Sequence, residues 1–237
     1  MNGPVNDRPR LTERDRAILR HIMRYRITTN EVLHRTMFAG MAANSVTKMT
    51  RRLCRMQYLR QFPLIHPQTY FVAGERAVRD FGISVHRTRP LGPQSLPVEY
   101  AVLAYSTLGK EAHFRLTISE ITQRYSWIPP SISEQPHCER RQEKNVVLES
   151  IRVDLGGAAD HIARKCDSDL QSRVGHPEFY ALVADRRFRA VVLTATTDKA
   201  AAIEQSLSTH LWPESYAIHL ATVPELLQLI PGGFHAR

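Results

Sequence analysis

The sequence lacks any apolar run long enough to cross a bilayer, and its first ten residues are polar. A membrane-spanning helix takes about 20 mainly apolar residues, and a secretory leader takes a shorter apolar core. Neither pattern occurs in the 237 residues. We therefore expect a cytoplasmic protein with no membrane partner.

Cysteine is also scarce. Cys54, Cys138 and Cys166 stand far apart, and none belongs to a CxxC pair. An odd number of separated cysteines argues against a disulfide framework and against a structural zinc site. The sequence also has no glycine-rich phosphate loop, HxH or HExxH motif, so we expect no metal and no cofactor.

Acidic residues are few in the first two fifths of the chain. Residues 1–96 hold 17 Lys and Arg against 6 Asp and Glu, a net charge of +11, whereas residues 97–237 hold 15 against 17, a net charge of −2. Sixteen of the first 17 cations are arginine, which contacts phosphate and guanine through two hydrogen bonds at once. We therefore expect residues 1–96 to bind a polyanion.

Three helices are predicted in this basic part. The first begins after Thr12, which is placed to cap it with Asp15 in the first turn, and ends near Arg26. The second follows a capping box of Thr28 and Glu31, and the third covers about residues 42–56.

The third predicted helix has one apolar face and one basic face. Its apolar stripe is Val46, Met49, Leu53 and Met56, at helical spacing. A helix stabilised by surface ion pairs would mix charges of both signs. Here the outer positions carry four cations and no acid, and they are Asn44, Lys48, Arg51, Arg52 and Arg55.

Two extended runs, residues 58–64 and 69–73, follow around a proline-containing tip, and a short helix over 75–81 closes the region. This order predicts a winged helix-turn-helix domain over residues 1–86, whose third helix enters the major groove. Similar tri-helical domains also serve in protein interactions, but the acid-free third helix favours DNA.

A linker is predicted over residues 87–97, which contain three prolines and a glycine. Beyond it, strands and helices alternate, which predicts an α/β sandwich with a mixed sheet over residues 98–237. His137 and Cys138 are assigned to a polar loop. Predicted helices cover 98–108, 158–173, 198–211 and 223–229, and extended segments cover 114–121, 126–132, 146–153, 189–194 and 216–221.

Several segments together resemble the replication-relaxation family of bacterial plasmids and other mobile elements. They are Leu-Thr-Glu-Arg-Asp-Arg-Ala-Ile-Leu (11–19), Thr-Arg-Arg-Leu-Cys-Arg-Met (50–56), Tyr-Phe-Val-Ala-Gly-Glu (70–75), Val-Asp-Leu-Gly-Gly (153–157) and Phe-Arg-Ala-Val-Val-Leu-Thr (188–194). The resemblance covers about residues 11–209. It implies a winged helix joined to a restriction-endonuclease-like domain, with a part in replication control, mobilisation or transcription.

Nucleases of that fold hold a divalent metal with an Asp on one strand and an Asp/Glu-x-Lys triplet on the next. Here the run Trp127 to Pro130 has no Asp, Arg152 stands where an acid is expected, and residues 97–237 contain no such triplet. Glu149, Asp154 and Asp160 are the carboxylates left to gather round a metal, but Asp154 is expected instead to cap the following helix. We therefore expect no catalytic residue.

These observations predict a sequence-specific double-stranded-DNA-binding protein that is not an enzyme and that acts as a homodimer, because helix-turn-helix proteins commonly read two half-sites. The alternatives are a metal-dependent nuclease, or an adaptor that binds a replication or transfer protein. The expected DNA-binding residues are Asn44, Ser45, Thr47, Lys48, Arg51, Arg52, Arg55, Arg60, His66 and Gln68. The first four of these residues are expected to reach base edges, the three arginines of the helix to lie nearer the phosphates, and the three hairpin residues to touch the adjacent backbone or minor groove.

Overall fold

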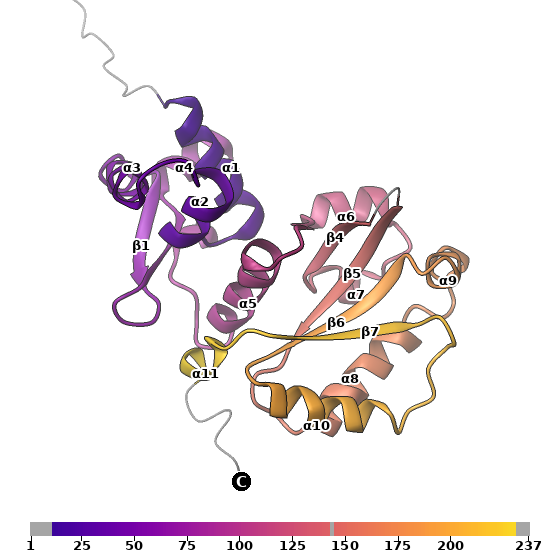
Figure 1. The fold of residues 1–237 in the computed structure, drawn as a ribbon. Helices are drawn as coiled ribbons and strands as arrows, with labels where there is room; N and C mark the ends of the chain where they lie inside the picture. The colour runs from indigo at the N-terminus through magenta and orange to yellow at the C-terminus, as the bar shows by residue number, and fades with distance from the viewer. Residues whose placement is uncertain (1–10, 143–144, 231–237) are drawn as a thin grey trace, which may run out of the picture. The chain divides into compact units, whose positions relative to one another are not determined.

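The computed structural model describes residues 11–142 and 145–230 (Figure 1). The chain divides into two compact units, Met1–Pro90 and Leu91–Arg237, and the division falls within the segment predicted as a linker. The described residues form an α/β protein with eleven α-helices, a two-stranded sheet and a five-stranded mixed sheet. None of the described helices is both long and apolar enough to span a membrane.

The first unit has three helices, then an antiparallel strand pair and a further helix. Its core is continuous across these elements, with Ile18 and Ile22 from α1, Leu33 from α2, Leu53 from α3 and Phe71 from β2 all buried. The elements are α1 (Glu13–Tyr25), α2 (Asn30–Met37), α3 (Ala43–Arg55), β1 (Leu59–Pro63), β2 (Thr69–Ala73), α4 (Glu75–Phe81) and the 3-10 helix η1 (Val85–Thr88).

Helix starts in this unit follow the predicted chemistry, with one correction. Thr12 and Asp15 form the capping box of α1. For α2 the predicted cap, Thr28, is wrong, because Thr29 accepts the Val32 N–H at 3.1 Å. Thr28 instead exchanges backbone hydrogen bonds with Phe71, which ties the α1–α2 connection to the strand pair.

The predicted linker over 87–97 is ordered at both ends. Thr88 belongs to η1, is buried, and donates its hydroxyl to the Val85 carbonyl. At the other end, helix α5 (Ser95–Leu108) already includes Pro97. A proline near a helix start costs no hydrogen bond because the first four N–H groups have no partner within the helix.

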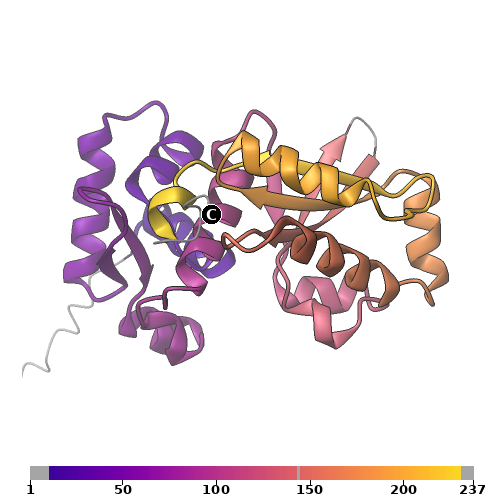
Figure 2. The ribbon, with the colours of Figure 1, turned by 90° about the horizontal axis from the view of Figure 1, so that it is seen from below.

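The second unit is built on a sheet with strand order β3-β4-β5-β6-β7. β4 runs antiparallel to both of its neighbours, β3 and β5, and β6 and β7 continue parallel to β5. α5 packs against one face, while α8 and α10 lie side by side on the other (Figure 2). The further elements are β3 (His113–Arg115), β4 (His137–Gln142), β5 (Asn145–Val153), β6 (Phe188–Thr194), β7 (Ala217–Thr222), α6 (Ile118–Arg124), α7 (Pro130–Ser133), α8 (Ala159–Gln171), α9 (Pro177–Ala184), α10 (Thr197–Leu207) and α11 (Leu226–Leu229).

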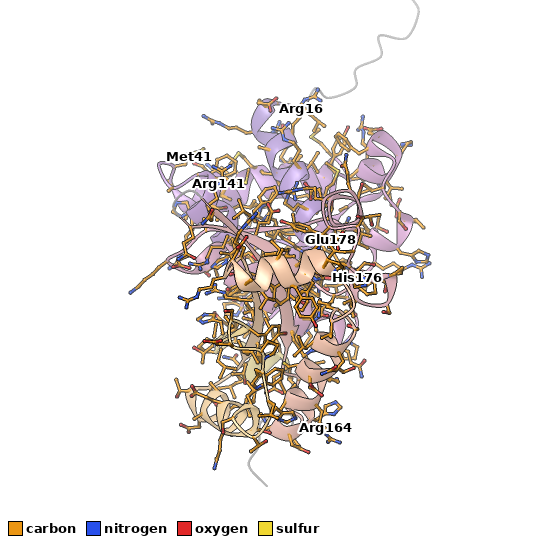
Figure 3. The ribbon with its side chains drawn as sticks, turned by 90° about the vertical axis from the view of Figure 1, so that its right-hand side faces the viewer. Arg16, Met41, Arg141, Arg164, His176 and Glu178 are labelled. Atoms are coloured by element: carbon orange, nitrogen blue, oxygen red, sulfur yellow. The ribbon has the colours of Figure 1, made fainter. Side chains whose placement is uncertain are left out.

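Two predicted extended segments of this unit are wrong. The run 114–121 leaves the sheet after Arg115, since Thr117 and Glu120 form a capping box that begins α6. The run 126–132 contains no strand, and Pro130 begins α7. The sequence analysis did not predict β4 or α9. The N-terminal end of α9 carries His176 and Glu178 (Figure 3).

Candidate nucleic-acid interface

Helix α3 carries an exposed polar stripe opposite its buried side. Val46, Thr50 and Leu53 are fully buried and fix which way the helix faces. Positions three and four apart share one face of a helix. The exposed residues follow that spacing, and we call them the α3 stripe: Asn44, Lys48, Arg51 and Arg55.

Asn30 of α2 fixes the rotation of α3. Its carboxamide oxygen accepts the Thr50 hydroxyl at 2.9 Å, and its nitrogen donates to Thr47 at 3.4 Å. Thr47, expected at the DNA surface, is therefore half-buried and engaged with α2. Ser45, on the other side of Asn44, is also half-buried.

Arg52 differs from the expectation of an unpaired cation. Its guanidinium donates to the buried carboxylate of Asp15, whose other oxygen accepts the N–H and hydroxyl of Thr12 at 2.8 and 2.7 Å. The side chain of Arg52 stays 38% exposed, so this pair both ties α3 to α1 and leaves part of the cation in solvent. Helical periodicity could not predict the pair of Arg52 and Asp15, because the two residues are 37 positions apart in the sequence.

An open groove of about 720 Å³ runs between the start of α1 and α3. Its acid, Glu13, accepts a hydrogen bond from Arg20 at 2.6 Å, and this bond and charge hold the pKa of the Glu13 carboxyl below its ordinary value. Arg16 is exposed on α1 (Figure 3) but does not line the groove. The groove joins Arg14 to the basic residues of α3 and is lined by Thr12, Glu13, Arg14, Lys48, Met49, Arg52 and Arg55.

The strand pair beside α3 presents the remaining predicted contacts. β1 packs against α3, and the guanidinium of Arg60 lies over the Phe62 ring, 5.3 Å from its centre. His66 and Gln68 are exposed in the connection between β1 and β2. All ten predicted residues therefore belong to one helix or to the strand pair next to it.

The carboxylates that the structure describes in the second unit do not gather into a metal site. Glu149 binds His113 at 2.7 Å and Arg189 at 2.5 Å, and Asp160 pairs with Arg164 on α8 at 2.9 Å. Across residues 11–142 and 145–230, no three His, Cys, Asp or Glu side chains are placed to hold a metal ion.

The prediction that Asp154 caps the helix that follows it is wrong. Its two oxygens accept the Gly156 N–H and the Thr194 hydroxyl, both at 3.0 Å, and its side chain is fully buried. The N-cap residue of α8 is instead Ala158, which makes no side-chain cap hydrogen bond. Asp154 thus joins the end of β5 to the end of β6.

Glu149 is the centre of a buried ion-pair cluster under α5. Burial opposes ionisation of the carboxyl, but the hydrogen bond and charge of His113, with those of Arg189, outweigh it and lower its pKa. The hydroxyl of Tyr105 also reaches Glu149, at 3.3 Å, and burial raises the pKa of that phenol. The Glu149 carboxylate accepts hydrogen bonds from His113, Arg189 and Tyr105, which indicates a structural cluster, although the Nε of Arg189 is buried with no hydrogen-bond partner among the described residues.

His137 and Cys138 lie in strand β4 and not in a polar loop. Both are buried, and burial lowers the pKa of His137 to about 4 and raises the pKa of Cys138 to about 12. The Nδ1–H of His137 donates to the Gln135 carbonyl at 2.7 Å. The pair faces the two sides of a strand and forms no joint ligand set.

We compared the chain with known proteins once this geometry was established. No protein-family model, no curated protein and no solved structure in these comparisons matches it.

Proposed function

We propose that the first unit binds double-stranded DNA, with α3 in the major groove and β1–β2 as the wing of a winged helix-turn-helix. The observation that carries the proposal is the α3 stripe, which contains one amide, three cations and no acid. The opposite side of α3 is buried, and hydrogen bonds with Asn30 of α2 fix the rotation of the helix. A helix of this width fits the major groove of B-DNA, where side chains meet base edges.

The stripe divides into two parts along the helix. Asn44 and Lys48 lie in the first half of α3, with Ser45 beside them, and these reach base edges. Arg51 and Arg55 lie in the second half and contact phosphates, together with Arg14 across the groove. Arg52 supports these contacts through its pair with Asp15 while its exposed part adds charge.

The wing adds contacts to the adjacent backbone. Arg60 is exposed and held over Phe62, while His66 and Gln68 stand in the exposed turn. Thr47 keeps its hydroxyl on Asn30, so we assign it to positioning of α3 more than to base reading. The net charge of +11 over residues 1–96 supplies the long-range attraction to DNA.

For the whole protein we propose a non-enzymatic, homodimeric DNA-binding regulator of transcription or replication on a bacterial mobile element. The second unit is then a restriction-endonuclease-like domain without its catalytic groups. The support is the strand arrangement, three antiparallel strands continued by two parallel ones, and the pairing of Glu149 with Arg189 and Arg140 where a metal site would need free carboxylates.

The test is a titration of the full chain with labelled fragments of its own upstream DNA and with random-sequence DNA, at several salt concentrations. If about six phosphates are neutralised, the logarithm of the association constant falls against the logarithm of salt with a slope near −5. Binding that is weak and nearly independent of salt would contradict the proposal. The same reactions with Mg²⁺ or with chelator test for cleavage, which would establish the nuclease alternative.

Two variants separate the assigned roles. Arg51→Gln weakens binding to all sequences and reduces the salt slope by about 1, whereas Asn44→Ala relaxes preference at one or two base pairs. The matched control is Lys165→Gln, which removes an exposed cation from α8 in the second unit. Equal losses in Lys165→Gln and Arg51→Gln would show that binding follows total charge and not α3.

A further inference from the structure

Strand β7 forms an open edge of the five-stranded sheet. It pairs with β6 on one side, and no described strand pairs with its other side (Figure 1). Every residue of β7 is at least partly exposed, whereas six of the seven residues of β6 are buried. The opposite edge of the sheet is β3, which has three residues and offers little length for pairing.

Within its own six residues, β7 has no charged side chain, proline or bulge that would protect an edge strand. Natural edges are usually short, charged, interrupted by proline or bulged. β7 has six residues, Ala-Ile-His-Leu-Ala-Thr, with no Lys, Arg, Asp, Glu or Pro. Its register with β6 runs without a bulge from Ala217 to Thr222.

A groove of about 940 Å³, lined by apolar and polar side chains, lies along this edge, between β7 and α10. Glu204 is the one residue with a formal charge among those that line it. Leu211, in the connection between α10 and β7, is 97% exposed. The apolar and small residues of the groove are Ala200, Ala201, Leu207, Trp212, Ile218 and Leu220.

The backbone of β7 is complementary to a second copy of itself. Val223, just beyond β7, donates its N–H to Thr194 of β6, and successive N–H groups alternate in direction along a strand. The N–H and C=O groups of Ile218, Leu220 and Thr222 therefore point away from β6. These three residues are symmetric about Leu220, so an antiparallel copy centred there pairs Ile218 with Thr222, Leu220 with Leu220 and Thr222 with Ile218.

Leu211 gives the same two-fold arrangement an apolar anchor. α10 connects the parallel strands β6 and β7, so it runs antiparallel to β7 and its first turns lie near Thr222. Antiparallel pairing of two β7 strands brings the first turns of α10 in the second copy toward Leu211 of the first copy. Ala200 and Ala201 have small side chains there, which leave room for Leu211 of the other copy.

We propose that β7 and the β7–α10 groove form a homodimer interface, in which two copies join their sheets antiparallel into one ten-stranded sheet. The interface adds about six backbone hydrogen bonds, two for each of three residue pairs, and covers the groove between β7 and α10. It deepens the proposed function, since a two-fold axis presents two first units to two half-sites.

The test is light scattering of the full chain over a range of concentrations. Wild type is expected to have twice the 27.1 kDa mass of one chain at micromolar concentration. Leu211→Glu is expected to raise the dimer dissociation constant at least tenfold, and Thr222→Pro, which removes an outward N–H, to raise it as well. The matched control, Ile118→Glu, introduces the same charge at a 57% exposed position of α6 and leaves the mass unchanged.

Each outcome bears on this interface separately from DNA binding. A wild-type monomer at these concentrations overturns the proposal, and so does a dimer that Leu211→Glu leaves intact. Binding of Leu211→Glu to a single half-site, measured by anisotropy, reports the first unit alone. Loss of dimerisation with retained half-site binding supports both proposals, whereas a stable dimer without DNA binding removes the proposed function and keeps the interface.

Discussion

At the scale of single residues, Asp15 connects the two helices that form the proposed DNA-binding surface. One carboxylate oxygen closes the capping box of α1, and the other accepts a hydrogen bond from Arg52 on α3. The side chain is fully buried, while its cationic partner is 38% exposed. A buried carboxylate is tolerated when its oxygens are hydrogen-bonded, as both are here.

Asp15→Ala is expected to lower the free energy of unfolding of the first unit by about 2 kcal/mol, because a cap and a charge-assisted hydrogen bond are lost together. Hydrogen exchange of the α1 and α3 amides measures this change within the full chain. Glu13→Ala serves as control, since it removes an exposed carboxylate that pairs with Arg20. Unchanged protection in Asp15→Ala would show that the pair contributes no stability.

At the scale of elements, the entry into α4 depends on a residue without a side chain. A Cβ at Gly74 would lie 2.2 Å from the backbone oxygen of Gln57, and Gln57 itself has a positive φ of 60°. The same oxygen accepts the Arg76 N–H at 3.0 Å, so it cannot move without loss of that bond. The turn after α3, β2 and the start of α4 are thereby held in close contact.

Gly74→Ala is expected to destabilise the first unit by about 2 kcal/mol, because the backbone must shift to admit one methyl group. Thermal unfolding followed by circular dichroism measures the effect. The control is Gly40→Ala, where an added Cβ meets nothing within 4 Å. Equal melting temperatures for the two variants would contradict the close approach at Gly74.

The second strand of the large sheet carries a buried histidine that is neutral in the folded protein. Burial and the nearby charge of Arg173 lower the pKa of His137 to about 4, from an ordinary value of 6.5. Its Nε2 has no hydrogen-bond partner among the described residues. The unfolded chain therefore takes up a proton on this residue at a higher pH than the folded chain does.

Because the folded pKa is lowered, the stability that depends on neutral His137 is complete above about pH 6.5 and falls as the pH decreases toward about 4. The expected loss is about 2 kcal/mol between pH 7 and pH 5. Urea unfolding followed by tryptophan fluorescence measures it, since Trp127 and Trp212 both lie in the second unit. His137→Leu should flatten this pH dependence, whereas His161→Leu, at an exposed position of α8, should not.

At the scale of the whole molecule, charge and chain division coincide. The basic excess lies in residues 1–96, and the first compact unit ends at Pro90. The proposed DNA surface uses side chains of the first unit, whereas the proposed dimer interface uses the backbone edge of the second. The two surfaces share no residue, so variants of one are expected to leave the other intact.

This separation predicts that Arg51→Gln and Leu211→Glu have independent effects. Arg51→Gln should change half-site affinity and leave the mass at that of wild type, and Leu211→Glu should do the reverse. The double variant should show the sum of both free-energy changes, measured by anisotropy and light scattering. A coupling of more than about 0.5 kcal/mol in half-site affinity would contradict independence.

Local patterns in the sequence determined the first unit nearly element by element. Helical spacing, the Thr12–Asp15 cap and the proline-containing turn predict α1, α3 and the strand pair, because each depends on neighbours within a few positions. The exposed stripe of α3 could be predicted for the same reason.

Only the tertiary structure decided which polar residues are buried partners. Arg52 meets Asp15 from 37 positions away, and Glu149 meets Arg189 from 40. β4 was missed because its charged sequence, His-Cys-Glu-Arg-Arg-Gln, reads as a loop until neighbouring strands supply hydrogen bonds and counter-charges. The open edge at β7 likewise exists only through the strand order, because an edge is defined by the absence of a neighbour and no local pattern records it.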